Sequence, residues 1–320
     1  MEENSEMNVM SVVCVILKNI IYGSSVFFTG ELTDSVDVFD ILALRFLMSF
    51  VTLWILKTTR IIKIEIQVRD FFVKNERSPY VKSLLLGAVF EPVLYMIFET
   101  FGISMTTGIT AGVILALSPI ISCITEFFVL KEKSGIAHII FIAIGIAGIV
   151  YITVNTNTST GENTVWGILC VFLAVVSGTF FTAFSRKSSK HFAPLEISYT
   201  SCILGTAVFN AINIARHLYM GNISSYFLPY FNIDNLIGFI FISIISSIAA
   251  TGMGNYALKK MQISTAAAFG GISTLVTVGI GVLVAGETLY TYHIIGLIMI
   301  FVNIIGVTCL ARKKASAKLN

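Results

Sequence analysis

The amino-acid sequence predicts an all-α integral membrane protein whose ten transmembrane helices form two inverted five-helix repeats. Three observations lead to this prediction: the chain is 56% apolar and only 12% charged, it contains ten long apolar runs, and its two halves resemble each other. A soluble domain carries about 25% charged residues, so this chain has too little polar surface to cover itself in water. The net charge of +3 is too small to indicate a nucleic-acid partner.

Each apolar run is long enough for a helix that crosses the hydrocarbon layer, which takes about 20 residues. The runs are uniformly apolar, whereas the strands of a transmembrane barrel alternate between apolar and polar residues. The first residues lack the basic region of a signal peptide, so we expect the first run to remain in the protein. The expected spans are 8–29, 37–57, 81–103, 107–129, 135–153, 165–185, 197–217, 235–257, 262–285 and 289–310.

Lysine and arginine residues are concentrated on one side of the expected spans. Alternate loops and the C-terminal tail hold eighteen of them, whereas the other loops together hold only Arg216. Because cytoplasmic loops carry an excess of positive charge, we expect both termini in the cytoplasm, and we expect the plasma membrane as the location. One missed or additional span would disrupt this alternation, so the loop charges also favour the count of ten.

The two halves of the chain match when one is shifted by 155 residues, which places 109–140 on 264–295. Both segments contain the pattern E-x5-H-I-I, so a duplication is the better interpretation than a chance match. We expect a first repeat at 1–155 and a second at 156–320. Each repeat holds five spans, an odd number, so the second copy enters the membrane from the opposite side. Secondary transporters use such inverted repeats for alternating access to a central site.

Several segments resemble the EamA-type branch of the drug/metabolite transporter superfamily. The strongest match is "PIISCITEFFVLKEKSG" at 119–135, and "GIGVLVAGETLYTYHIIGLIMIFVNIIGV" in the second half is similar to the corresponding family segment. Two positions depart from the family pattern, since Tyr22 replaces a common tryptophan and Thr274 replaces the proline of the second copy. The resemblance implies ten helices in two repeats and the export or exchange of small metabolites such as amino acids or drugs. It implies no particular substrate.

Charged residues inside the spans are the strongest indication of a functional site. A charge at the centre of a span costs about 2.5–3.5 kcal/mol, so it usually faces a cavity or a partner. Lys18, Arg45 and Glu91 lie near the centres of the first three spans and therefore share one depth. Glu99 lies roughly 12 Å farther along the third span, at 1.5 Å per helical residue.

The third span carries its polar residues at intervals of four. Glu91, Tyr95 and Glu99 therefore follow one side of the helix, and Pro92 is expected to kink it beside Glu91. We interpret this side as one polar wall of a central cavity. The predicted substrate or proton pathway consists of Lys18, Tyr22, Arg45, Glu91, Tyr95, Glu99, Asn210 and Asn255.

Two roles are open for the charges at the membrane centre. Glu91 could form a structural ion pair with Lys18 or Arg45, or it could take up a proton on one side of the membrane and release it on the other. Burial in an apolar medium disfavours the charged form of a carboxylic acid, which makes the second role physically reasonable. The two roles overlap, because a buried pair can open when a substrate arrives.

The sequence indicates neither a cofactor nor a metal site. Its five cysteines lie in apolar runs without CxxC spacing. His138 and His293 belong to repeats of opposite orientation, so they lie near opposite membrane faces and cannot share one metal ion. Without an HExxH motif, a GxSxG motif or a P-loop, an enzyme or an ATP-driven pump is disfavoured. A secondary transporter is the leading prediction, a channel or a nucleotide-sugar-type exchanger is the alternative, and a homodimer is left open.

Overall fold

The protein is represented by a computed structural model that describes residues 9–33, 35–66, 78–105, 114, 117–131, 135–155, 165–284 and 290–316. Every regular element in these ranges is a helix, as predicted. Six helical segments are long and apolar enough to cross a membrane, and four shorter apolar helices lie where the other predicted spans fall. The predicted boundary between residues 155 and 156 borders a range outside the described residues, so it stays a prediction.

The helices of the two halves follow one another in the same order. The first half contains α1 (Val9–Thr33), α2 (Val38–Thr58), α3 (Ser78–Ala88), η2 (Val89–Leu94), α4 (Tyr95–Ser104), α6 (Ser118–Thr125), η3 (Glu126–Leu130) and α7 (Ile136–Asn155). The second half contains α8 (Val165–Ser188), α9 (Pro194–Met220), η4 (Ile223–Ser225), η5 (Leu228–Phe231), α10 (Ile233–Ile240), η6 (Phe241–Ala250), α11 (Thr251–Lys260), α12 (Ile263–Ala268), α13 (Gly271–Leu283) and α14 (Thr291–Ser316).

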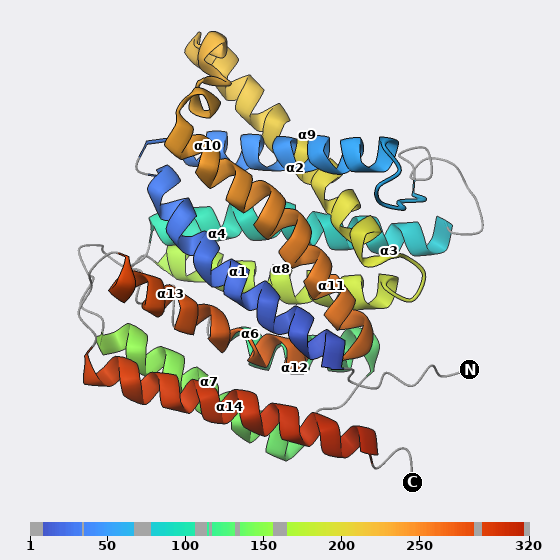
Figure 1. Ribbon diagram of the computed structural model, residues 1–320, viewed down its shortest axis with the longest axis vertical. Coiled ribbons are helices and arrows are strands. Elements are labelled where there is room, and N and C mark those ends of the chain that lie inside the picture. The colour runs from blue at the N-terminus through green and yellow to red at the C-terminus, as the bar shows by residue number, and fades with distance from the viewer. Residues whose placement is uncertain are drawn as a thin grey trace.

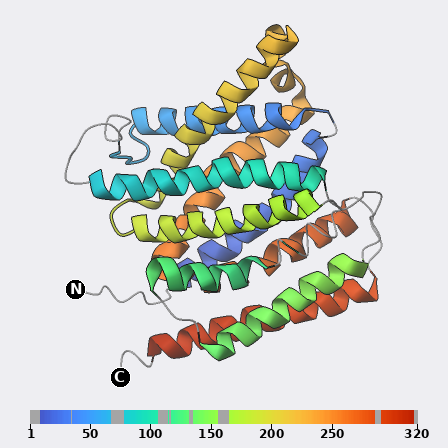
Figure 2. The ribbon, with the colours of Figure 1, turned by 180° about the vertical axis from the view of Figure 1, so that it is seen from behind.

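Corresponding helices of the two halves run in opposite directions. In Figure 1, α1 runs from right to left and α8 from left to right, and α2 and α9 are opposed in the same way. The beginning of α1 and the end of α14 lie at the same end of the bundle (Figures 1 and 2). This arrangement confirms the predicted inverted repeats.

The contacts between helices are also related by the inverted repeat. α2 packs along α9 and α7 along α14, so each of these two pairs joins corresponding helices. α1 packs on α13 and α11, while α8 packs on α6 and on the segment from α3 to α4. When each helix is replaced by its counterpart in the other half, the contacts of α1 become the contacts of α8. The contacts therefore have the pseudo-two-fold symmetry that a duplicated, inverted bundle requires.

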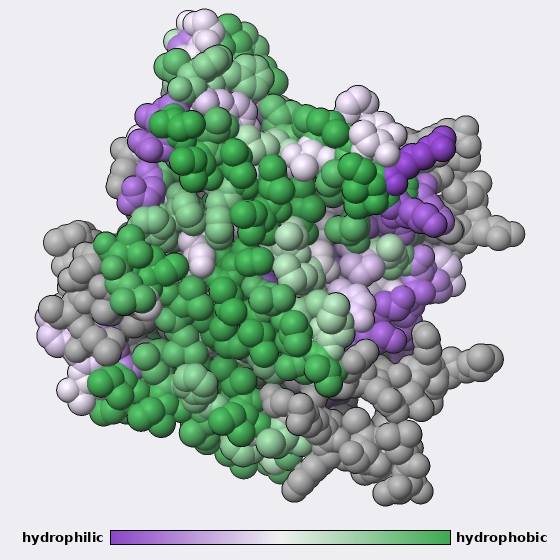
Figure 3. Space-filling view, in the orientation of Figure 1, coloured by the Kyte–Doolittle hydropathy of each residue, from purple (hydrophilic) through white to green (hydrophobic). Residues whose placement is uncertain are grey.

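The surface shows why this bundle needs a lipid environment. Figure 3 shows a broad hydrophobic region over the middle of the molecule, with hydrophilic residues gathered toward the helix ends. Phe128 and Trp166 expose 73% and 72% of their surface, among many other large apolar side chains. Soluble monomers rarely expose contiguous apolar patches beyond a few hundred Å². The chain is a multi-pass integral membrane protein.

The third and eighth predicted spans are interrupted near their centres. The π-helical turns η2 and η6 lie between α3 and α4 and between α10 and α11, respectively. At Glu91 the backbone is extended, with φ −142° and ψ 124°. Pro92 follows and has no backbone N–H to donate, so the predicted kink is confirmed. Wide turns of this kind occur often at functional sites because they redirect side chains.

Small residues let helices of the two halves approach closely. A Cβ atom added at Gly23 of α1 would lie 2.5 Å from the carbonyl oxygen of Ser273 on α13. One added at Gly145 of α7 would lie 2.5 Å from the Asn303 amide nitrogen on α14. Only glycine fits such contacts, and small interface residues are a common device for packing helices in membranes.

Candidate functional site: a charged central cavity

A cavity of about 570 Å³ lies among helices of both halves. α1 and α11 are nearer the viewer in Figure 1, whereas α4 and α8 are nearer in the reversed view of Figure 2, so these helices form two layers around it. Its polar lining consists of Lys18, Tyr22, Ser25, Arg45, Glu91, Tyr95, Glu99, Ser118, Thr182, Ser198, Ser201, Ser246, Ser247, Thr251, Asn255 and Ser273. Seven of the eight predicted site residues are in this set; their role stays a prediction.

Lys18 and Tyr22 lie where α1 meets α11. The Lys18 ammonium nitrogen is 5.0 Å from the centroid of the Tyr22 ring, close enough for a cation–π contact. Gly254 of α11 makes room for the lysine, because a Cβ atom there would lie 3.0 Å from Lys18 Cδ. The Tyr22 hydroxyl is 3.0 Å from Thr251 Oγ1, which fixes the ring against the same helix.

Arg45 of α2 is anchored on the π-helical turn η6. Its Nε donates to Ser247 Oγ at 2.8 Å, and the same hydroxyl donates to the Ile242 carbonyl oxygen at 2.8 Å. With its proton engaged by that carbonyl, the Ser247 oxygen is left as an acceptor for the arginine. A guanidinium has five N–H donors, and the described residues supply a hydrogen-bond acceptor for Nε alone.

Glu91 and Tyr95 face α8 at Gly178. A Cβ atom at Gly178 would lie 3.2 Å from Tyr95 Cδ2 and 3.9 Å from Glu91 Oε2, so the glycine leaves the space that these side chains occupy. The Tyr95 hydroxyl donates to Glu99 Oε1 at 2.7 Å. Glu91, Tyr95 and Glu99 thus all line the cavity, although the extended backbone at Glu91 means that regular helical spacing does not place them there.

The structural ion pair that the sequence left open is not formed in this conformation. Within the described residues, no ion pair joins Glu91 to Lys18 or Arg45; the pairs present there are Arg186–Glu126, Arg216–Asp37 and His217–Asp40. The side chains of Lys18, Arg45, Glu91 and Glu99 are all partly exposed. These charges therefore line the cavity without a direct ion pair between them in this conformation.

The two predicted asparagines have different positions. Asn255 lines the cavity, but its amide accepts from Ser185 Oγ at 2.7 Å and donates to Ser198 Oγ at 3.1 Å. Asn210 is not part of the lining. Its amide donates to the Ala43 carbonyl oxygen at 3.1 Å and accepts from the Tyr226 hydroxyl at 2.6 Å. Asn210 thus joins α9 to α2 and to the following loop, a structural contact that position along a span does not distinguish from a cavity contact.

Sequence reasoning missed the hydroxyl residues of the eighth span. Ser246, Ser247 and Thr251 all line the cavity. Their only sequence signal is a run of small polar residues, "SSIAATG", within an apolar segment. Serine and threonine are common in membrane helices, where they bond to their own backbone, so this signal alone does not separate a site from ordinary packing.

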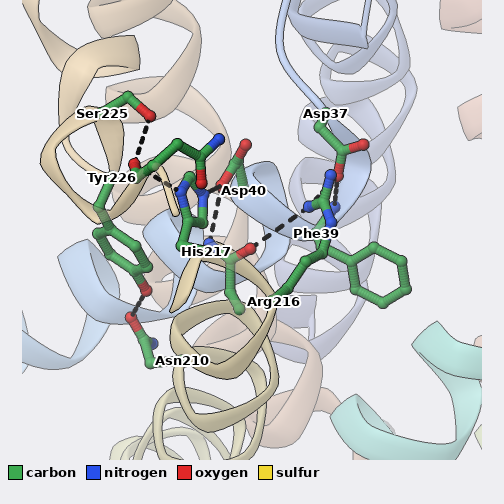
Figure 4. A network of polar contacts seen from close by, with 10 residues as sticks. Asp37, Phe39, Asp40, Asn210, Arg216, His217, Ser225 and Tyr226 are labelled. Atoms are coloured by element: carbon green, nitrogen blue, oxygen red, sulfur yellow. Dashed lines mark hydrogen bonds and ion pairs between the residues drawn. The ribbon is translucent and has the colours of Figure 1, made fainter. Parts of the chain in front are cut away.

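A second polar cluster lies outside the cavity, where the start of α2 meets the end of α9 (Figure 4). Arg216 Nη1 is 2.6 Å from Asp37 Oδ1, and His217 Nε2 is 2.7 Å from Asp40 Oδ1. Burial raises the pKa of the Tyr226 phenol, so its hydroxyl stays protonated and able to donate to Asn210. These contacts hold the two helix ends together.

The opposite end of the bundle is held by two buried glutamates. Glu196 of α9 accepts from the backbone N–H groups of Glu65 and Ile66, both at 3.0 Å, beyond the end of α2. Glu126 is 3.2 Å from Arg186 of α8 and also accepts from the Ile263 backbone N–H. The described residues include no group of three or more His, Cys, Asp or Glu side chains that could hold a metal ion.

Comparison with known proteins identifies related transporters. The sequence profile described as "EamA-like transporter family" matches residues 9–154 and again 165–309. The uncharacterized transporter YcxC of Bacillus subtilis (strain 168) is 28% identical over 302 residues, which cover 94% of each chain. A WAT1-related chloroplastic protein of Arabidopsis thaliana is 23% identical over 217 residues, covering 67% of this chain and 51% of its own.

A solved structure has the same fold. A crystal structure superposes with a TM-score of 0.70 and covers 95% of this chain and 98% of its own. At 16% identity, this likeness establishes the arrangement of helices alone.

Proposed function

Because the chain belongs to the EamA-like transporter family, we propose that it is a secondary transporter that exports or exchanges small organic metabolites by alternating access. The observation that carries the proposal is the central cavity with its charged side chains. Lys18, Arg45 and Glu91 are not paired with one another, and they lie where two inverted repeats meet. A transporter, rather than an enzyme, is also what the named relatives indicate.

Alternating access has a physical basis in the repeats. Two similar units of opposite orientation can exchange conformations, and the exchange turns a cavity open to one side into a cavity open to the other. α2 and α9 are tied at both ends, through Asp40 and through Glu196. We therefore propose that α2 and α9 stay fixed relative to each other, and that the other helices around the cavity move when the cavity changes the side to which it opens.

Proton coupling through Glu91 is part of this proposal. Its carboxylate is next to the break in the third span and faces Gly178, with Lys18, Arg45 and Glu99 as the other charged groups of the cavity. Protonation would change the net charge of the cavity, and hence the relative stability of the states open to either side. A site reached from each side in turn can then move protons against solute.

The orientation and location are also proposals. Exposed lysine and arginine side chains lie in the last turn of helices that end where α1 begins, or just beyond it; they include Arg60, Lys63, Lys187 and Lys259. Cytoplasmic segments carry such an excess. We therefore place both termini in the cytoplasm and the protein in the plasma membrane.

Counterflow in proteoliposomes tests the function. Vesicles holding purified protein are preloaded with one compound of a panel of amino acids, nucleosides and cationic drugs, and uptake of the labelled compound is followed with and without a pH gradient. We expect saturable counterflow for at least one compound. Uptake that rises linearly with concentration, without counterflow, would identify a channel instead.

The Glu91→Gln variant tests the proton step. We expect counterflow to persist and the response to the pH gradient to disappear, because the glutamine amide does not titrate. Glu31→Gln is the matched control, since Glu31 is exposed near the end of α1, outside the cavity lining. An unchanged pH response in the Glu91 variant would reduce Glu91 to a packing residue.

A further inference from the structure

The cavity is lined by buried residues at the end where α8 and α11 end, which is also where α1 begins (Figure 1). They include Phe181 of α8, Ser198 of α9 and Leu258 of α11. Lining residues nearer the other end, such as Ser25 of α1 and Glu99 of α4, are partly exposed. In this conformation the cavity is therefore separated from the side that we propose to be cytoplasmic.

Asn255 joins three helices at this closed end. Its side-chain oxygen accepts from Ser185 Oγ of α8 at 2.7 Å, and its amide nitrogen donates to Ser198 Oγ of α9 at 3.1 Å. The same nitrogen lies 3.4 Å from the Pro194 carbonyl oxygen at the beginning of α9. The three side chains are buried, so these hydrogen bonds form without competition from water. One residue of α11 thus connects α8 to the first turns of α9.

A second polar contact lies beside the first. Arg186 follows Ser185 on α8, and its Nη1 is 3.2 Å from Glu126 Oε1 of η3. Glu126 also accepts from the Ile263 backbone N–H at the beginning of α12, and both charged side chains are buried. This contact joins η3, α8 and α12, so the two contacts together hold five helical segments at one end of the cavity. The closing cluster consists of Ser185, Ser198, Asn255, Glu126 and Arg186.

The same cluster cannot form at the other end of the cavity. Gly30, Ala43 and Gly281 stand at the positions that correspond, at the offset of 155 residues, to the two serines and the glutamate of the closing cluster. None of the three has a polar side chain. The contacts of Asp40 and Glu196 join α2 to α9, which we propose stay fixed, so they do not distinguish the two states. Hydrogen bonds made in one state alone shift the balance toward that state.

We propose that the closing cluster is the cytoplasmic gate of the transporter and that it holds the protein, in the absence of solute, in the conformation closed to the cytoplasm. This inference rests on the proposed function, since it assigns the control of access to the same cavity. Opening requires α8, α11, η3 and α12 to move apart, which breaks the contacts of Asn255 and Glu126. The Glu126 carboxylate and the Arg186 guanidinium then need water, because a buried charge without its partner is strongly destabilising.

The separation of α8 and α11 at the gate is the quantity that tests this inference. Spin labels are attached through Lys187→Cys and Lys259→Cys, two exposed positions, in the full chain with its five native cysteines replaced by alanine. Pulsed electron paramagnetic resonance in lipid nanodiscs then gives the distribution of distances without solute. We expect Asn255→Ala and Glu126→Gln each to raise the fraction of longer distances by about threefold to tenfold, since a lost hydrogen bond shifts a two-state balance by that order.

Asn155→Ala and Glu31→Gln are the matched controls for these two variants. Both residues are exposed and lie outside the cavity lining, so the distances should not change. If Asn255→Ala lowers thermal stability too far for the measurement, Ser185→Ala removes one hydrogen bond of the same contact and should shift the distances in the same direction. A change of less than about twofold when the two contacts are broken together would overturn the inference.

A crosslink provides the opposite perturbation. Ser185→Cys and Asn255→Cys replace two side chains whose oxygen atoms are 2.7 Å apart. Oxidation should hold the gate closed and abolish counterflow, and a reductant should restore it. Counterflow that continues in the crosslinked protein would contradict the gate.

The gate and the transport proposal fail separately. If the distances shift as expected but the wild-type protein shows no counterflow for any compound, the gate stands and the proposed transport is wrong. If the wild-type protein shows counterflow and the distances of the cluster variants stay unchanged, the transport stands and the gate is wrong.

Discussion

The two halves of the protein have the same arrangement of helices but contribute different types of side chain to the cavity. Within the described part of the lining, all four side chains of Lys, Arg, Asp or Glu belong to the first half. The second half contributes hydroxyl groups, one asparagine, and glycines such as Gly178 and Gly254. At the offset of 155 residues, Glu91 corresponds to Ser246 and Glu99 to Gly254.

The difference shows that symmetry and site chemistry are separate properties of this fold. Inverted packing needs only matched helix lengths and small residues at close contacts, such as Gly23 and its counterpart Gly178. The cavity, by contrast, needs space beside its charges, an acceptor for Arg45 and a donor for Glu99. Charges in the first half and small residues in the second half are complementary, so neither half contains a site by itself.

The largest effect is expected when a carboxylate is moved from one half to the other, in a Glu91→Ser/Ser246→Glu double variant. A carboxylate on η6 would lie on the side of the cavity that holds Lys18 and Arg45 and would neutralise one of these two cations. We expect transport to fall about a hundredfold, from about 3 kcal/mol of lost charged contacts. Initial counterflow rates measure the effect, with Glu31→Ser as the control. A loss of less than about threefold would mean that the two halves are interchangeable.

A Gly254→Leu variant tests whether the second half provides the space for Lys18. A Cβ atom at this position already lies 3.0 Å from Lys18 Cδ, so a leucine must displace the lysine. Overpacking costs about 1–3 kcal/mol, and we expect ligand affinity to fall about thirtyfold. Calorimetry measures this fall. Gly279→Leu is the matched control, because a Cβ atom there has no neighbour within 4 Å among the described residues; equal losses in both variants would exclude a specific role for Gly254.

Removing one hydroxyl in Ser247→Ala should loosen Arg45 with a smaller effect. A hydrogen bond to a charged group contributes about 1.5–3 kcal/mol, so affinity for an anionic group should fall about tenfold. The measurement is again calorimetric. Ser243→Ala on the same helix removes a buried hydroxyl that has no hydrogen-bond partner in the described structure, and it should leave affinity unchanged. The opposite ranking of the two variants would show that Ser247 does not position Arg45.

The smallest effect on transport is expected for Asn210→Ala, although the position was predicted as a site. Its loss removes the hydrogen bonds that the Asn210 amide makes to the Ala43 carbonyl oxygen and from the Tyr226 hydroxyl, which should lower the free energy of unfolding by about 1–3 kcal/mol. Counterflow per folded molecule should change less than about twofold. Thermal unfolding in detergent measures the stability, and counterflow measures the transport rate. A large transport defect without destabilisation would show that Asn210 belongs to the substrate pathway.

Much of the architecture could be predicted from patterns that depend only on local chemistry. Apolar runs, alternating loop charge and the repeated segments indicate an inverted helical bundle, and the depth of Lys18, Arg45 and Glu91 places them near one plane. Their neighbours could not be predicted in this way. Whether an asparagine such as Asn210 or Asn255 faces a cavity depends on the rotation of its helix, which packing against other helices sets.

The membrane location and the inverted halves could be read from the sequence, and charges near the membrane centre are predicted from it, because hydrophobic transfer and the cost of a buried charge act on each span separately. That the cations lie beside the eighth span and the carboxylates beside α8 follows from the packing of the helices. That division arises from helices far apart in the chain, where Gly178, Ser247 and Gly254 leave space or supply an acceptor. Such contacts depend on how helices pack, and no single span carries that information.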